Sequence, residues 1–179
     1  MTGSVESNYS LALFQLAEND TPLLTAVRDE LVQIKGIIKE NPDFVKLMDT
    51  PTVGLEQKLD VLKAFDKAQP YVYNFLRVLA ENGRYSYYEK ITDAFCRLYN
   101  DKLGIGEITV TSALPLSEKQ LADIKAKMGE ITGKTIVITQ KTDKSIMGGV
   151  VIDYGDQRFD GSVKTRLEAL KQSFGQLIG

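Results

Sequence analysis

The spacing of apolar residues changes within this chain, and the change constrains the fold more than any other feature. From Tyr9 to Leu103 the apolar residues recur every three or four positions, which is typical of amphipathic helices. Beyond Leu103 they alternate with polar residues, as in a half-buried strand. We therefore expect an α+β protein with two domains, a helical bundle over residues 1–104 and a small α+β domain over residues 105–179, joined at Gly104–Gly106.

Helix start and stop residues divide the first part into six expected helices. Thr21-Pro22 and Asn41-Pro42 have the form of an N-cap followed by the first helical residue, and Pro70 opens a further helix. Asn82-Gly83 ends that helix, because both residues tolerate the left-handed conformation of a C-terminal cap. The residues expected to point inward are Tyr9, Leu13, Leu16 and Ala17; Leu24, Val27, Leu31, Ile34 and Ile38; Leu55, Leu59, Leu62 and Phe65; Val72, Phe75, Leu76 and Leu79; and Tyr88, Ile91, Phe95 and Leu98.

The second part is expected to combine strands with two helices. Residues 105–113 alternate as a strand, and Ser117 with Gln120 has the form of a capping box that starts a helix. The inward residues of that helix are expected to be Leu121, Ile124, Met128 and Ile131. The remaining expected elements are strands at residues 134–140 and 147–154, a turn at Gly155-Asp156, a return strand at Arg158-Phe159 and a last helix over residues 162–178.

The composition argues against several classes of function. Histidine is absent, which removes the commonest general base and metal ligand, and the single cysteine excludes an intrachain disulfide. The net charge of -2 argues against binding of nucleic acid by bulk phosphate attraction. No apolar run approaches the roughly 20 residues that span a bilayer, and the start of the chain has no signal peptide, so we expect a cytoplasmic protein or one held at a membrane by partners.

Glycine and aspartate clusters are the first candidates for a ligand site. Gly104–Gly106 and Gly148-Gly149 lack the spacing of a phosphate-binding loop, so we favour a hinge for the first and a bulge or close backbone approach for the second. Asp153, Asp156 and Asp160 suggest a cation site, but they lack the ligand spacing of a calcium loop. Turn formation and helix capping are the favoured roles for these acids.

Tyrosines and the cysteine are the second group of candidates. Tyr85, Tyr87 and Tyr88 follow Arg84 and could stack on bases, but their acidic surroundings favour packing or a partner contact. Cys96 lies among apolar helix residues with no histidine to activate it, so we expect it to pack.

Two long segments near the end of the chain have a distinctive order of features. Ile146–Asp156 is an apolar strand with a glycine pair that ends in a Gly-Asp turn, and Phe159–Leu170 continues through Asp-Gly-Ser into a basic helix. This order resembles the C-terminal signature of the delta subunit of F-type ATP synthases, called the oligomycin sensitivity-conferring protein in mitochondria. Tyr9–Ala17 and Arg77–Arg84 are similar to the first helix of that family and to the end of its fifth. The likeness covers nearly the whole chain.

The resemblance implies a connector without catalytic residues, cofactor or metal, working as a monomer within the peripheral stalk on the cytoplasmic face of a bacterial membrane. Its six-helix bundle would bind the N-terminal helix of an alpha subunit, and its second domain would hold the C-terminal end of the b subunits. The expected alpha-subunit contacts, in a groove between the first and fifth helices, are Tyr9, Leu13, Leu76, Val78 and Leu79. The expected b-subunit contacts and signature residues are Gly148, Gly149, Asp160, Gly161, Ser162, Lys164, Arg166 and Lys171.

Other interpretations remain open at this point. The basic outer face of the last helix fits either plain solvation or an acidic partner helix. A helical RNA-binding regulator is the alternative from another class, although the net acidity argues against it. A nucleotide-hydrolysing enzyme would need a phosphate loop that the sequence lacks.

Overall fold

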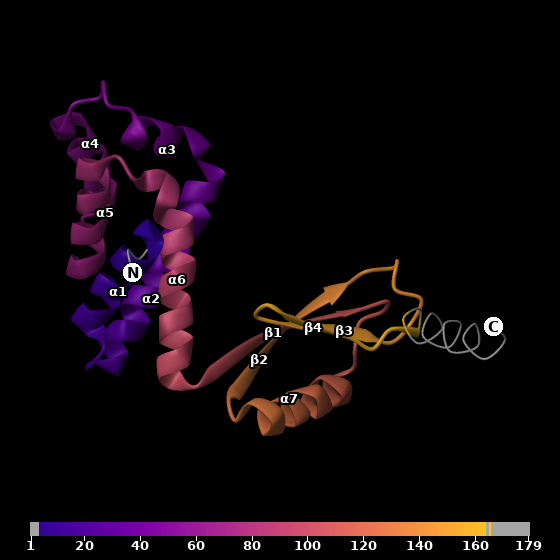
Figure 1. The fold of residues 1–179 in the computed structure, drawn as a ribbon. Coiled ribbons are helices and arrows are strands. Elements are labelled where there is room, and N and C mark those ends of the chain that lie inside the picture. The colour runs from indigo at the N-terminus through magenta and orange to yellow at the C-terminus, as the bar shows by residue number, and fades with distance from the viewer. Residues whose placement is uncertain (1–3, 164, 166–179) are drawn as a thin grey trace, which may run out of the picture. The chain divides into compact units, whose positions relative to one another are not determined.

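The computed structural model describes residues 4–163 and residue 165, and it has an α+β fold divided into two compact units, Met1–Asn100 and Asp101–Gly179 (Figure 1). The described helical elements before the sheet are α1 (Val5–Ala17), α2 (Thr21–Glu40), α3 (Pro42–Asp49), α4 (Leu55–Leu62), η1 (Lys63–Phe65), α5 (Pro70–Asn82), η2 (Tyr85–Tyr87) and α6 (Tyr88–Leu103). Gly104 follows the last of these helices directly.

Helix α2 packs against α1, α3 and α5 in the first unit. All five apolar residues that its spacing predicts to point inward are buried, so this face is confirmed. Its N-cap is Asp20 rather than the predicted Thr21, because the Asp20 carboxylate accepts a hydrogen bond from Leu23 N at 3.0 Å. The predicted stop of α5 is confirmed, since Gly83 has φ 59° in the left-handed region.

Two buried tyrosines join the helices of the first unit. The Tyr85 hydroxyl donates to Leu76 O at 3.0 Å, and the Tyr88 hydroxyl donates to Leu31 O at 3.1 Å. Burial raises the pKa of both side chains, so each phenol stays protonated and keeps its donor role. Because both rings lie in the core, they offer no platform for stacking bases, and the packing interpretation is confirmed for Tyr85 and Tyr88, whereas Tyr87 is 37% exposed.

Some predicted inward faces of the first unit are wrong. Leu16 is 56% exposed and Leu55 is also exposed, whereas Phe14 and Ser10 are buried beside Leu13. On α1, apolar residues surround most of the helix, so spacing alone does not identify the side that meets α2 and α5.

The second unit is a four-stranded sheet with one described helix. Its elements are β1 (Ile105–Ser112), α7 (Glu118–Thr132), β2 (Thr135–Thr142), β3 (Val150–Tyr154) and β4 (Gln157–Asp160). The strand order in the described chain is β2-β1-β3-β4. β1 and β2 are parallel and α7 connects them, whereas β3 pairs with β1 and β4 in antiparallel fashion.

Helix α7 covers one face of this sheet, where Ile108, Val110, Met128 and Ile136 form the core (Figure 1). The predicted alternation of β1 and the capping box of α7 are confirmed. Ile131 is 71% exposed, contrary to prediction, because it lies in the last turn of α7, one turn beyond the buried Met128.

The predicted strand 147–154 begins only at Val150, because Gly148 and Gly149 have positive φ values outside the ladder. The predicted strand 134–140 occupies Thr135–Thr142. The hairpin is confirmed: Gly155, with φ 57°, turns the chain from β3 into β4. The last helix, predicted over residues 162–178, lies almost wholly outside the described residues.

Candidate partner-binding surfaces

The residues predicted to bind an alpha-subunit helix divide into two groups. Leu13, Leu76 and Leu79 are buried in the core of the first unit, so in this structure they support a surface rather than form one. Tyr9 and Val78 are half-buried and reach the surface of α1 and α5. The structure therefore leaves two of the five predicted residues accessible to a partner.

Tyr9 joins α1 to α5. Its ring meets the Phe75 ring edge-on at a centroid distance of 6.4 Å. The Arg84 guanidinium lies 5.7 Å from the centroid of the Tyr9 ring, and Arg84 Nη1 donates to the Tyr9 hydroxyl at 3.4 Å. These contacts fix the ring, so it is ordered before any partner arrives.

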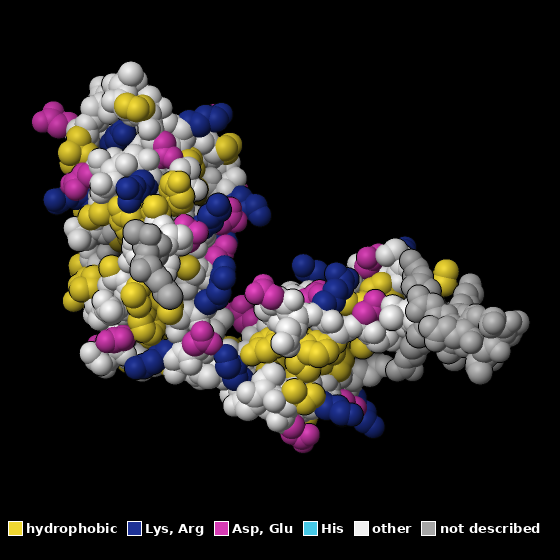
Figure 2. Space-filling view, viewed as in Figure 1, with side chains coloured by type: hydrophobic (Ala, Val, Ile, Leu, Met, Phe, Trp, Pro, Cys, Tyr) yellow, Lys and Arg dark blue, Asp and Glu magenta, His cyan; other side chains and the backbone are white. Residues whose placement is uncertain are grey.

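Two exposed residues extend this surface. Leu16 lies seven residues after Tyr9 on α1, so these two side chains share one face of that helix. Tyr71 lies seven residues before Val78 on α5, so these two share one face of α5. We call Tyr9, Leu16, Tyr71 and Val78 the α1–α5 seam. Figure 2 shows apolar side chains gathered on the visible face of this unit among charged ones. Sequence reasoning missed Tyr71, because a tyrosine beside Pro70 gives no signal of exposure.

The glycine pair of the second unit allows two backbone segments to meet. A Cβ on Gly149 would lie 2.5 Å from Gly161 O, and Gly149 has φ 85°. Val163 N donates to Gly148 O at 3.0 Å, and Gly161 N donates to Val150 O at 2.9 Å. The predicted close backbone approach is confirmed, and it fastens the chain beyond β4 to the start of β3.

Asp160 and Ser162 cap the segment that follows β4. The Asp160 carboxylate accepts from Ser162 N at 2.9 Å and from Thr165 Oγ1 at 2.8 Å, while Ser162 Oγ accepts from Thr165 N at 3.3 Å. The backbone and side-chain hydrogen bonds from Ser162 lower the pKa of Asp160. The Asp153 carboxylate instead lies 3.6 Å from Arg158 Nε. The described residues hold no acidic cluster that could bind a metal ion, and the capping role of Asp160 is confirmed.

Exposed apolar residues gather at one end of the sheet. β1 and β4 finish at this end and β3 begins there, since Ser112 pairs with Val150. Leu114 is 74% exposed and Met147 80%, and Val163 is exposed as well. We call Leu114, Met147 and Val163 the sheet-end cluster. Lys164, Arg166 and Lys171 lie outside the described residues.

The described helices include none that is long and apolar enough to cross a membrane. The described residues form an α+β fold with apolar side chains exposed on both units. The model of one family, the ATP synthase delta (OSCP) subunit, matches residues 5–174, and the chain belongs to this family. It is therefore a non-catalytic subunit and no enzyme in its own right.

Relatives with curated names agree over nearly the full length. The chain is 35% identical to the ATP synthase subunit delta of Lactobacillus johnsonii, covering 94% of this chain and 93% of that one. It is 32% identical to the ATP synthase subunit delta of Clostridioides difficile, covering 99% of both chains. The mitochondrial ATP synthase subunit O of Ipomoea batatas is 33% identical over 94% of this chain and 70% of that protein.

A solved structure has the same fold. A chain of the mitochondrial ATP synthase hexamer of Toxoplasma gondii superposes with a TM-score of 0.72 at 30% identity, covering 99% of both chains. These matches do not support the RNA-binding alternative.

Proposed function

We propose that this chain is the stator connector of an F-type ATP synthase: it links the catalytic head to the b subunits of the peripheral stalk, so that proton-driven rotation is coupled to ATP synthesis. The observation that carries the proposal is the family match over residues 5–174, which includes both compact units. A connector needs two separate docking surfaces, and each unit has an exposed apolar one.

The first docking surface belongs to a six-helix bundle formed by α1 to α6. We assign the alpha subunit's N-terminal helix to the α1–α5 seam. An amphipathic helix binds by placing apolar side chains in a groove at three- and four-residue spacing, and the seam offers two parallel rows of such contacts. Leu13, Leu76 and Leu79 then act from beneath by holding the two helices at a fixed distance.

The second docking surface belongs to residues 105–179. We assign the end of the b subunits to the sheet-end cluster together with Lys164, Arg166 and Lys171 of the following segment. Apolar side chains that are followed in the sequence by basic ones suit an amphipathic partner helix with an acidic flank. Gly148, Gly149, Asp160, Gly161 and Ser162 have a positioning role there, since they fix the backbone next to Met147 and Val163. The protein is a monomer in the complex, peripheral to the cytoplasmic face of a bacterial membrane.

The alpha-subunit assignment is tested by titrating the full chain with a peptide of the alpha N-terminus. Leu16→Asp should weaken binding by about 2 kcal/mol, because a charge in a desolvated contact is costly. Val32 on α2 is a matched control, since it is also an exposed apolar residue outside the seam. Equal affinity of the Leu16→Asp and Val32→Asp proteins would place the peptide elsewhere.

The b-subunit assignment is tested by pull-down with purified b subunits. Met147→Asp should reduce the capture of b, whereas Ile131→Asp, at a similarly exposed position on α7, should not. A chain ending at Asp160 should lose b and still bind the alpha peptide. Normal capture of b by both altered chains would move the site away from this end of the sheet.

A further inference from the structure

A cavity of about 520 Å³ opens between the end of α2, α3 and the start of α6. None of its lining residues belongs to the α1–α5 seam, and none comes from the second unit. Its size falls in the range of about 300–1,000 Å³ that is usual for small-molecule sites. The proposed stator contacts therefore give this cavity no role.

The floor of the cavity is apolar and fixed. Ile38 of α2 is 9% exposed and Val45 of α3 is half-buried, so both present carbon surface to the cavity, whereas Tyr88 is 0% exposed and has no surface that a ligand could reach. The Tyr88 hydroxyl donates to Leu31 O, so this buried residue leaves no unpaired hydroxyl beside the cavity. An apolar body placed here would lose water contact without leaving a polar group unpaired.

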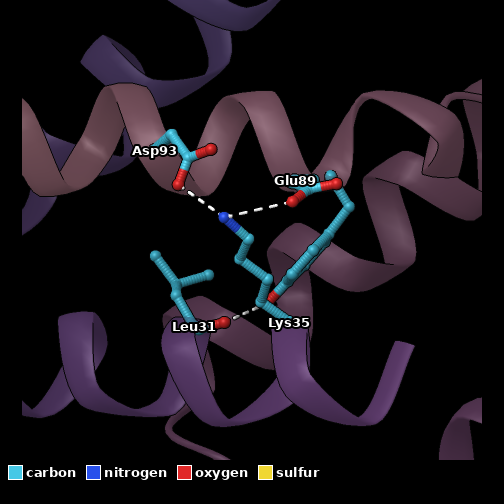
Figure 3. A network of polar contacts seen from close by, with 5 residues as sticks. Leu31, Lys35, Glu89 and Asp93 are labelled. Carbon is cyan, nitrogen blue, oxygen red and sulfur yellow. Dashed lines mark hydrogen bonds and ion pairs between the residues drawn. The ribbon is translucent and has the colours of Figure 1, made fainter. Parts of the chain in front are cut away.

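The rim carries three lysines, of which one is committed. Lys35 Nζ lies 2.6 Å from Asp93 Oδ1 and 3.4 Å from Glu89 Oε1, and Figure 3 shows its amine directed at these two acids of α6. Burial opposes its charge, but the hydrogen bond to Asp93 and the nearby acids outweigh that effect and raise the pKa of Lys35. Lys35 is therefore committed within the protein, because its positive charge is more than balanced by these two acids.

The other two rim lysines keep positive charge to offer. Lys39 is exposed and forms no ion pair with any of the described residues. Lys46 pairs only with Asp43 of its own helix at 2.9 Å, and both side chains are so exposed that the pair is worth little. Asp49, the acid on the opposite wall, is held by the backbone amides of Tyr85 and Ser86 at 2.6 and 2.9 Å.

We propose that this cavity binds a small amphipathic anion, with an apolar body on Ile38 and Val45 and a carboxylate at Lys39 and Lys46. Charge and shape both select this class. A neutral apolar ligand leaves the two lysines unused, and a compact ion such as phosphate leaves the apolar floor empty. The body is either an aliphatic chain or a flat ring, since both fit carbon surface of this kind.

The test is titration of the full chain with octanoate, 2-naphthoate and 1-octanol, followed through the backbone amide resonances of Val45 and Ser86. At least one carboxylate should shift both resonances, and the two carboxylates distinguish a chain from a ring. Octanol should bind about tenfold more weakly than octanoate, because it lacks the charge. Octanol binding as tightly as octanoate, or no shift at either residue with either carboxylate, would overturn the proposal.

Variants supply the second arm. The double variant Lys39→Gln with Lys46→Gln should weaken carboxylate binding by about fivefold to tenfold and leave octanol unchanged. Lys67→Gln is the control, since Lys67 is an exposed lysine outside the cavity. Equal carboxylate affinity in the double variant and the control would contradict the proposal. The outcome is independent of the stator function, because binding of the alpha peptide uses the α1–α5 seam.

Discussion

Gly149 shows how a single residue holds the second unit together. Its left-handed backbone and the contact with Gly161 leave no room for a side chain. The sequence indicated a close approach at the glycine pair, but it did not reveal that the approaching segment comes from beyond β4. That information depends on strand order, which local patterns do not contain.

Gly149→Ala should destabilise the second unit by about 3 kcal/mol, because it adds a backbone clash to the strain of a positive φ. Gly155→Ala is the matched control, since Gly155 also has positive φ but open space around its Cα, and its cost should be about 1 kcal/mol. Urea unfolding followed by amide resonances of β1 measures both. Equal costs would show that the Gly161 contact relaxes without penalty.

The buried tyrosines should make the first unit sensitive to alkali. Their pKa values are raised in the fold by burial, so the stability they contribute is complete below the unfolded tyrosine pKa of about 10 and is lost as pH rises above it. Tyr88→Phe should flatten this loss and cost about 1 kcal/mol at neutral pH through the hydrogen bond to Leu31 O. Urea midpoints between pH 8 and 11, read by far-ultraviolet circular dichroism, test this, and Tyr87→Phe at an exposed position should leave the slope unchanged.

At the scale of elements, caps and starting points were more predictable than faces. The Ser117 capping box, the Gly83 stop and the prolines at helix starts follow from short-range chemistry, and the structure has them all. Leu16 and Ile131 were assigned inward and are exposed. Spacing identifies an apolar stripe but does not show where the neighbouring element ends.

Ser117→Ala should destabilise the second unit by about 1 kcal/mol, because Gln120 N loses the Ser117 hydroxyl that accepts its hydrogen bond at 3.3 Å. The other half of the capping box, the hydrogen bond from Ser117 N to the Gln120 side chain, remains. Ser117→Asp should restore most of the loss, since aspartate also caps. The measurement is again urea unfolding at the amides of β1. No difference between alanine and aspartate would show that α7 is held by the sheet alone.

At the scale of the molecule, the two units allow separate measurement. Seven of the eight tyrosines lie before residue 101 and only Tyr154 lies after it, so near-ultraviolet circular dichroism follows mainly the first unit. The site residues were hard to predict. Leu13, Leu76 and Leu79 are buried in the core. No sequence pattern distinguishes an apolar residue that packs in the core from one that contacts a partner.

Gly36→Ala should raise the near-ultraviolet unfolding midpoint, because Gly36 lies in the interior of α2 with open space around it, and alanine there gains about 0.5–1 kcal/mol. Gly149→Ala should leave the same midpoint unchanged if the units unfold independently. A joint shift would show that the two units unfold as one cooperative body.

The position of β1 has a mechanical consequence. Only Gly104 separates α6 from this strand, and β1 lies inside the sheet between β2 and β3. The chain enters β1 at the end of the sheet where Ile105 pairs with Thr135. It leaves β4 at the opposite end, where Asp160 pairs with Val151. Tension along the chain therefore pulls the sheet from opposite ends, parallel to its strands. Its ladder hydrogen bonds are sheared together instead of peeling apart one at a time, which is the strand geometry that resists stretching best.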